Sequence, residues 1–181
     1  MVVTDADDPH TDLRLVAPSQ ALVDAYLSYA AEWRGGGYAR FDLGPEDFDA
    51  FLAKLERDAD EATLPAGRVP SATRWLLHGE AGAERIVATS RLRFWVTPAL
   101  ENEGGHIGYD VCPSQRGRGY GHAILRHTLV EARRRGIDRV VVTCDEDNLA
   151  SRRIIEAAGG ELLGRGLSED TGVPVRRYAI E

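Results

Sequence analysis

The segment Ser114–Leu125, SQRGRGYGHAIL, constrains the fold of this chain more than any other. Its glycines lie between a short apolar stretch and a segment whose apolar residues have helical spacing. A strand, a glycine-rich turn and a helix start together form an anion site, because the first helical amides lack partners and the helix dipole adds positive charge. Glycines let a large anion approach, and Arg116 and Arg118 add charge. We predict a phosphate or diphosphate site; the alternative is a surface turn with scattered arginines.

Two other phosphate-binding motifs do not fit this segment. A Walker loop needs Gly-Lys followed by Ser or Thr, and the single lysine of the chain is Lys54. A dinucleotide fingerprint has the spacing G-x-G-x-x-G and opens the first βαβ unit of a sheet. Here the spacing is G-x-G-x-G, and three predicted strands come directly before it.

The rest of the chain is typical of one mixed α/β domain. Residues 1–10 are polar and acidic and predict a flexible arm, which leaves residues 11–181 for the domain. Apolar patterns predict strands at 13–18, 69–79, 84–96, 105–111, 137–144, 160–166 and 173–180, of which the last two form an antiparallel pair. Helical spacing predicts helices at 20–33 (capped by Ser19), 44–62, 121–135 and 149–158 (capped by Asn148).

Composition restricts the partners and the compartment. The net charge of −7 argues against a nucleic-acid or anionic-membrane binder. The two cysteines, Cys112 and Cys144, lack metal-ligand spacing and are too few for a disulfide framework, so we expect no metal and a reducing compartment. The N-terminus does not read as a signal peptide, and no apolar run approaches a membrane span. We therefore expect a cytoplasmic protein.

Together these features resemble the GCN5-related N-acetyltransferases (GNAT). The acetyl-CoA motif of that family, Arg/Gln-x-x-Gly-x-Gly/Ala after a strand, is present as Arg116-Gly117-Arg118-Gly119-Tyr120-Gly121. Residues 105–160 follow the family order of strand, pyrophosphate loop, helix, strand and Asn-capped helix. The stretch DEDNLASRRIIEAAGG is similar to the Asn-x-x-Ala/Ser segment of the family. Within the family the chain looks closest to a branch of predicted acetyltransferases.

The resemblance implies an α/β GNAT fold in a single domain, with a mixed, mostly antiparallel central sheet flanked by helices. The sheet would be splayed between strands 105–111 and 137–144, where the pantetheine arm of acetyl-CoA could bond both backbones like an inserted strand. Strand 105–111 would also direct an N–H at the thioester carbonyl. The residues implied to bind acetyl-CoA are Val111, Cys112, Arg116, Gly117, Arg118, Gly119, Tyr120, Gly121, Asn148 and Ser151.

The resemblance also bears on the catalytic groups. Acyl transfer to an amine needs a proton acceptor or a water chain, because an alkylammonium is almost fully protonated at neutral pH. Many relatives have a glutamate where this chain has His106, so His106 is the candidate base; the alternative is that it only begins a strand. Many relatives also carry a tyrosine that protonates the leaving thiolate, at the position of Ile155. No general acid is therefore assigned.

Asp145 and Tyr38 are the candidate acceptor-binding residues. Asp145 opens the acidic turn DED after a predicted strand, which could attract a cationic amine or form a solvated turn before a helix. Tyr38 follows a glycine turn in a region that borders the acceptor site of relatives.

We therefore expect acetyl transfer from acetyl-CoA to an amine-bearing small molecule or peptide. The alternative is a non-catalytic acyl-CoA-binding or sensing module that has kept the loop. No nucleic acid or membrane is expected as a partner. The identity of the acceptor, and whether the chain forms a homodimer, stay open at this level.

Overall fold

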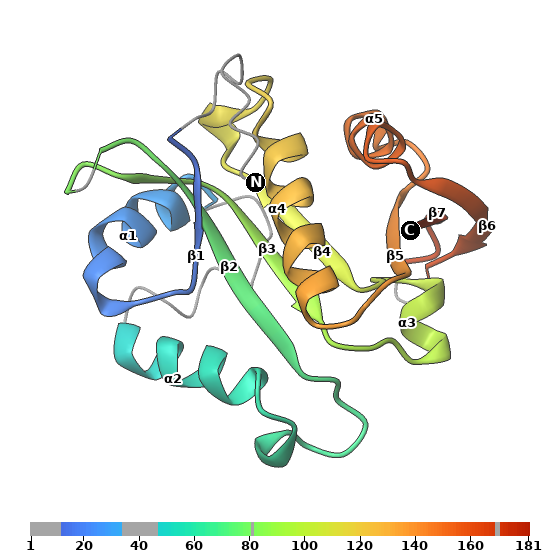
Figure 1. Cartoon of the computed structure of the whole chain (residues 1–181), viewed down its shortest axis with the longest axis horizontal. Helices are drawn as coiled ribbons and strands as arrows, with labels where there is room; N and C mark the ends of the chain where they lie inside the picture. Colours follow the sequence, from blue (N-terminus) through green and yellow to red (C-terminus); the bar gives the residue numbers. More distant parts are fainter. Residues whose placement is uncertain (1–11, 34–46, 81, 169–170) are drawn as a thin grey trace.

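The computed structural model describes residues 12–33, 47–80, 82–168 and 171–181; the predicted arm and Tyr38 lie outside them. The described strands form two antiparallel sheets, of order β1-β2-β3-β4 and β5-β7-β6 (Figure 1). The strands are β1 (Arg14–Val16), β2 (Ser71–His78), β3 (Arg85–Arg93), β4 (Ile107–Val111), β5 (Val140–Asp145), β6 (Glu161–Leu167) and β7 (Pro174–Ile180). The α-helices are α1 (Val23–Ala31), α2 (Phe48–Asp58), α3 (Pro98–Asn102), α4 (Tyr120–Arg134) and α5 (Leu149–Ala157).

Helices cover both faces of the first sheet. Alternation along β2 sends Trp75 and Leu77 to the face under α1 and α2, and Leu76 to the face under α4. Trp75 stacks on Tyr26 of α1 with ring centroids 5.1 Å apart. Trp33 belongs to the same core. Burial of such aromatic and aliphatic side chains stabilises the domain by roughly 1.5–3 kcal/mol each.

The second sheet packs against α4 and α5. Val140 and Val142 of β5 and Tyr178 of β7 share a core with Leu125 of α4 and Ile155 of α5. In Figure 1, α4 lies over β3 and β4 of the first sheet, and α5 lies beside the β5-β7-β6 sheet. The last strand in sequence, β7, pairs with both β5 and β6, so the final residues complete this sheet.

The single central sheet expected from the sequence is divided in two. Each described strand pair is antiparallel, and β4 and β5 form no ladder although they lie close together. The parallel component of the expected mixed sheet would have been this β4–β5 pair. The expected splay is therefore present, and it extends over nearly the full length of the two strands.

Two helix starts differ from the prediction, and one helix was not predicted. The segment predicted as one helix begins with a 3₁₀ turn, Gln20–Leu22, and the Ser19 side chain makes no capping bond. Helix α2 begins only after Asp47, whose side chain accepts from the Ala50 N–H (2.9 Å). Helix α3 was not predicted, although its Thr97 cap and proline at the first helical position are a sequence signal for a helix start. Two further 3₁₀ turns are Glu61–Thr63 and Pro113–Gln115.

No helix among the described segments has both the length and the apolar character required to cross a membrane.

Candidate functional site

Strands β4 and β5 are joined at one end only. The His106 N–H donates to the Val141 carbonyl (2.7 Å), and the Val141 N–H donates to His106 Nδ1 (2.9 Å). Nearby, the Gly104 N–H donates to Thr143 Oγ1 (2.9 Å). A Cβ on Gly105 would lie 2.4 Å from the Val141 oxygen, and the Gly105 φ is +56°. Only glycine allows this approach, so Gly105 and His106 together close the sheet at this end.

Beyond this junction the backbone of β4 faces a gap. The Cys112 N–H donates to the Val87 carbonyl (2.9 Å) of β3, which places Cys112 among the residues that bond β3. In an antiparallel ladder the alternate residues, Tyr109 and Val111, direct their N–H and C=O groups to the other side, toward β5. This direction agrees with the predicted role of Val111.

The prediction for Cys112 needs correction. Its N–H is bonded to β3, and its carbonyl accepts from the Gln115 N–H (2.8 Å), so neither backbone group is directed to the gap. Its side chain is buried, and burial raises the pKa of the Cys112 thiol to about 11. Cys112 therefore ends the strand and contributes to the core under α1.

The backbone of β5 faces the same gap from the other side. The Glu146 N–H donates to the Pro174 carbonyl (2.8 Å), and by alternation Thr143 and Asp145 direct their backbone groups toward β4. An extended amide chain in this gap would find donors and acceptors on both sides. The backbone groups of the two strands thus match the needs of a linear, amide-bearing ligand.

The glycine loop leads from this gap to the N-terminus of α4. Gly117 and Gly119 have φ values of +75° and +84°, which are left-handed conformations that favour glycine. Gly119 is the N-cap residue and offers no side chain to the first amides of α4. Arg116 and Arg118 are exposed beside it, and the Arg116 guanidinium lies 5.5 Å from the Trp33 ring. Amides without a side-chain cap, the helix dipole and two guanidiniums are the features on which the prediction of an anion site rests.

The other two loop residues, Tyr120 and Gly121, have structural roles. Tyr120 is buried, and its hydroxyl lies 3.4 Å from His78 Nδ1, so its side chain belongs to the core and not to the surface of the loop. Gly121 does not have a positive φ. A Cβ at Gly121 would lie 2.5 Å from Ile154 Cδ1. Gly121 therefore allows α4 and α5 to pack closely.

Glu32, at the end of α1, holds the turn that precedes the loop. Its carboxylate accepts from the Ser114 N–H (2.9 Å) and from Ser114 Oγ (2.8 Å). Burial by itself raises the pKa of Glu32, but hydrogen bonds from Ser114 and Cys112 outweigh it and leave the pKa below its usual value. Sequence reasoning missed this contact, because 82 residues separate the partners.

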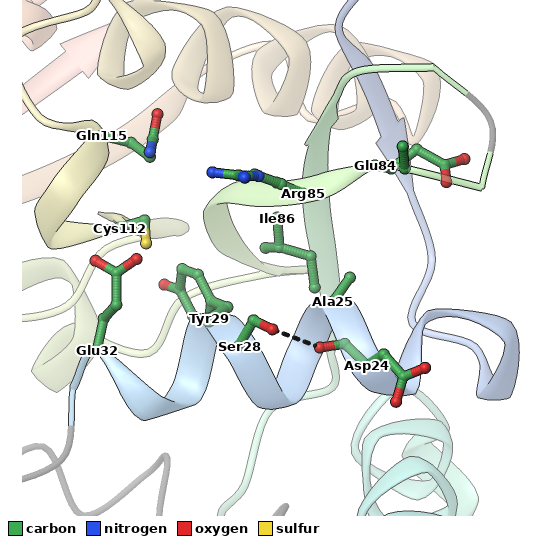
Figure 2. A pocket seen from close by; sticks show the side chains of 11 residues that line it. Asp24, Ala25, Ser28, Tyr29, Glu32, Glu84, Arg85, Ile86, Cys112 and Gln115 are labelled. Atoms are coloured by element: carbon green, nitrogen blue, oxygen red, sulfur yellow. Dashed lines mark hydrogen bonds between the residues drawn. The ribbon is translucent and has the colours of Figure 1, made fainter.

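A cavity of about 420 Å³ lies beside Glu32, between α1, the β2–β3 hairpin and the end of β4 (Figure 2). Glu32 and Cys112 lie side by side at one end of it, and Glu84 lies at the other end. Arg14 pairs with Glu84 at 2.7 Å. The cavity therefore marks where α1 supports the open end of β4, on the face of the sheet opposite α4.

Helix α5 begins as predicted at Asn148. The Asn148 side chain accepts from the Ser151 N–H (3.0 Å), which confirms the predicted cap. Ser151 Oγ in turn lies 3.0 Å from the Tyr109 hydroxyl of β4, a contact that sequence reasoning missed. Ile155, at the position where relatives often carry the acid, is fully buried in the core. Cys144 is also buried, and burial raises the pKa of its thiol, as expected of an inert cysteine.

The geometry does not favour His106 as a base. The side chain is only 7% exposed, and its Nδ1 lone pair already accepts the Val141 N–H. Burial is the main reason that the pKa of His106 lies below its ordinary value. A neutral imidazole whose Nδ1 accepts this bond serves to close the sheet. This role is close to the alternative given by the sequence, in which His106 only begins a strand.

The two acidic residues Asp145 and Glu146 at the end of β5 have different surroundings. Glu146 pairs with Arg176 (2.5 Å) and with Arg165 (3.5 Å), so it holds β5, β6 and β7 together. The Asp145 side chain is exposed at the end of β5, beside the gap. Tyr38, the second predicted acceptor contact, lies outside the described residues.

Comparison with known proteins identifies the family. The sequence profile of the acetyltransferase (GNAT) domain matches residues 12–161, and the chain therefore belongs to the GNAT acetyltransferase family. This confirms the resemblance, the fold class and the transferase activity predicted from the sequence. No curated protein sequence matches the chain significantly.

Several solved structures share the fold. RimL, the ribosomal L7/L12 alpha-N-protein acetyltransferase in complex with coenzyme A, aligns at 17% identity with a TM-score of 0.68 over 93% of each chain. The Microcin C7 self immunity acetyltransferase MccE, in complex with acetyl-CoA and AMP, aligns at 14% identity and a TM-score of 0.66 over 95% of this chain and 96% of MccE. An N-acetyltransferase from Staphylococcus aureus aligns at 17% identity and a TM-score of 0.59 over 94% of this chain and 99% of its own.

Proposed function

We propose that this protein transfers the acetyl group of acetyl-CoA directly to an amine, with the cofactor lying along the gap between β4 and β5. The observation that carries the proposal is the continuity of two features. Backbone groups of Tyr109, Val111 and Thr143 face the gap, and the gap leads to the uncapped amides at the start of α4. RimL and MccE, which share the fold, were solved with coenzyme A and with acetyl-CoA.

Each part of the cofactor has a matching part of the chain. The diphosphate suits the amides of Gly119 to Gly121 with Arg116 and Arg118 beside them. The amides of pantetheine suit the backbone of Val111, and Asn148 and Ser151 line the other side at the start of α5. The Tyr109 N–H, which is also directed into the gap, suits the oxyanion of the tetrahedral intermediate; such a donor is worth about 3–4 kcal/mol of barrier.

The reaction requires two proton movements. The amine nitrogen attacks the thioester carbon, the N–C bond forms, and the nitrogen loses a proton to an acceptor. The C–S bond then breaks, its electron pair goes to sulfur, and the thiolate takes up a proton to leave as CoA thiol. His106 stays the proposed base from the family pattern, and its buried, engaged Nδ1 makes solvent the competing acceptor. Asp145, exposed at the end of β5, is the proposed contact for a cationic acceptor.

Ligand-dependent unfolding tests the cofactor assignment. Acetyl-CoA or CoA at about a hundred times its dissociation constant should add about 2.7 kcal/mol to the free energy of unfolding, which gives a clear rise in melting temperature. NADH and ATP should have much smaller effects, because neither has the pantetheine arm that the gap suits. Equal shifts from all the ligands would reduce the site to a general anion site. A screen of amines by mass spectrometry then identifies the acceptor.

One observation favours a second function, a non-catalytic acyl-CoA-binding module. Ile155 stands where many relatives carry the acid, and it is fully buried. A protein of this kind would be stabilised by acetyl-CoA but would release no CoA. Measurement of free thiol during incubation with acetyl-CoA and a broad panel of amines separates the two functions.

A further inference from the structure

A tyrosine and a serine form a hydrogen-bonded pair between β4 and α5. Tyr109 lies in the middle of β4, and its hydroxyl is 3.0 Å from Ser151 Oγ in the first turn of α5. We propose that Tyr109 supplies the proton taken up by the departing CoA thiolate, either directly or through the Ser151 hydroxyl. This inference rests on the proposed acetyl transfer and adds the proton donor that the family pattern at Ile155 does not provide.

The position of the pair suits this role. The Tyr109 backbone faces the gap between the strands, while its ring packs against the cores on both sides of α4. Ser151 is held in place by the Asn148 cap, and its hydroxyl also reaches the Cys144 thiol of β5. The two hydroxyls therefore connect β4 with the start of α5 across the end of the slot where the thioester would lie.

The environment keeps the phenol in its protonated form. Burial is the largest influence on Tyr109 and raises the pKa of its phenol to about 12, so the group keeps its proton at physiological pH. Burial also raises the pKa of the Cys144 thiol beside Ser151. A CoA thiolate released in the same surroundings is by the same argument a stronger base than in water, which narrows the difference in basicity between thiolate and phenolate.

The proton balance is complete with the groups named. As the tetrahedral intermediate collapses, the C–S electron pair moves to sulfur and the carbonyl re-forms. Sulfur takes the Tyr109 proton, or takes the Ser151 proton while Tyr109 replaces it. The phenolate then recovers a proton from solvent after the products leave, which matches the proton lost by the amine.

The position of Ile155 explains why a strand residue would take this part. Its side chain is fully buried beside Gly160. A Cβ added to Gly160 would lie 2.6 Å from Ile155 Cγ2, so this side of α5 is packed into the core. Ser151, one turn earlier on α5, meets Tyr109 of β4. The hydroxyl thus reaches the site from the strand.

The test uses CoA itself and needs no acceptor. A hydrogen bond from Tyr109 or Ser151 stabilises the thiolate, so the pKa of bound CoA thiol, followed by ultraviolet absorbance of the thiolate, should rise by about one to two pH units in Tyr109→Phe. The affinity for desulfo-CoA, which lacks the sulfur, should change less than about twofold, because the phenol acts on sulfur alone. Tyr178→Phe is the matched control: its hydroxyl donates to Glu156 of α5 (2.9 Å), and its side chain is buried in the core against α5.

The outcomes separate the inference from the proposed function. If the wild-type protein does not bind CoA, the proposed function is overturned. Tight CoA binding with the same thiol pKa in the wild type and in Tyr109→Phe would overturn only the role of Tyr109. If Tyr109→Phe raises the pKa of the bound CoA thiol, Ser151→Ala separates the two routes. An unchanged thiol pKa in Ser151→Ala supports direct donation by Tyr109, and a rise equal to that in Tyr109→Phe supports donation through the serine. Once an acceptor is known, turnover of Tyr109→Phe should fall by about a hundredfold or more.

Discussion

The two ends of β4 are built on opposite principles. At Gly105 and His106 the strand is pressed against β5, with a backbone hydrogen bond and an imidazole in place of the next ladder bond. At Val111 the strand diverges from β5 and passes into an exposed turn that is held from the other face of the sheet by Glu32. One end is closed by buried contacts, and the other is left open with its amides exposed.

This difference shows how one strand can make a binding slot without a cavity of its own. A continuous ladder between β4 and β5 would satisfy every backbone group and leave nothing for a ligand to bond. Closing the strands at a single point fixes their separation at one end, and the divergence leaves Tyr109 and Val111 directed into the gap. The rigid junction sets the geometry, and the open end supplies the binding groups.

The largest effect should come from breaking the junction. Gly105→Ala places a Cβ against the Val141 carbonyl at a positive φ, and we expect the free energy of unfolding to fall by about 3 kcal/mol or more. Gly117→Ala is the control, because Gly117 also has a positive φ but nothing lies within 4 Å of its Cβ position; it should cost about 1–2 kcal/mol. Urea unfolding measures both. Equal losses in the two variants would mean that the junction does not depend on close approach.

The open end should instead lose binding. Gly119→Val forces a β-branched residue into the left-handed N-cap position, and should weaken CoA about a hundredfold through loss of the amide contacts. Arg118→Ala removes only an exposed charge and should weaken CoA by about fivefold or less. Isothermal calorimetry on both folded variants gives the comparison. Near-normal affinity in Gly119→Val would place the diphosphate elsewhere.

The junction should also be sensitive to acid through His106. Burial puts the pKa of folded His106 below its unfolded value, so the unfolded chain binds more protons in the window between the two. Its contribution to stability is therefore present above about pH 6.5 and is lost as the pH falls through the folded pKa. His106→Gln should lower stability by roughly 1–2 kcal/mol at pH 7.5 and remove this part of the acid dependence.

Urea unfolding between pH 7.5 and pH 5 checks this prediction, and pH–rate profiles with an identified acceptor check the competing one. A catalytic base predicts that His106→Gln lowers turnover about a hundredfold and abolishes the acidic limb while stability is unchanged. A residue that closes the sheet predicts the opposite pattern. The two measurements together decide between them.

The smallest effect should come from the support under the loop. Glu32→Gln keeps the shape but replaces a charged acceptor with a neutral one, and should weaken CoA by about threefold through a less fixed Ser114. Asp24→Asn, on the same helix and lining the same cavity, is the control and should leave affinity unchanged. Identical affinities for wild type and Glu32→Gln would show that the turn holds its position without α1.

Local sequence was enough to predict the parts of this protein whose causes lie within a few residues. The glycine loop, the start of α4 and the Asn148 cap follow from conformational preferences and short-range hydrogen bonds, and the structure has them close to where they were predicted. Strand periodicity likewise placed β2, β3 and the β6–β7 pair. The family pattern then connected these elements to acetyl transfer.

The tertiary structure alone decided which groups meet across the sheets. His106 meets Val141 over 35 residues, Tyr109 meets Ser151 over 42, and Glu32 meets Ser114 over 82. The sequence around each of these residues determines which face of its own element the side chain occupies, but not which other element packs there. The partner depends on how α1, α4 and α5 pack on the two sheets. This packing brings His106 to a hydrogen bond in the core and places the Tyr109 hydroxyl beside α5.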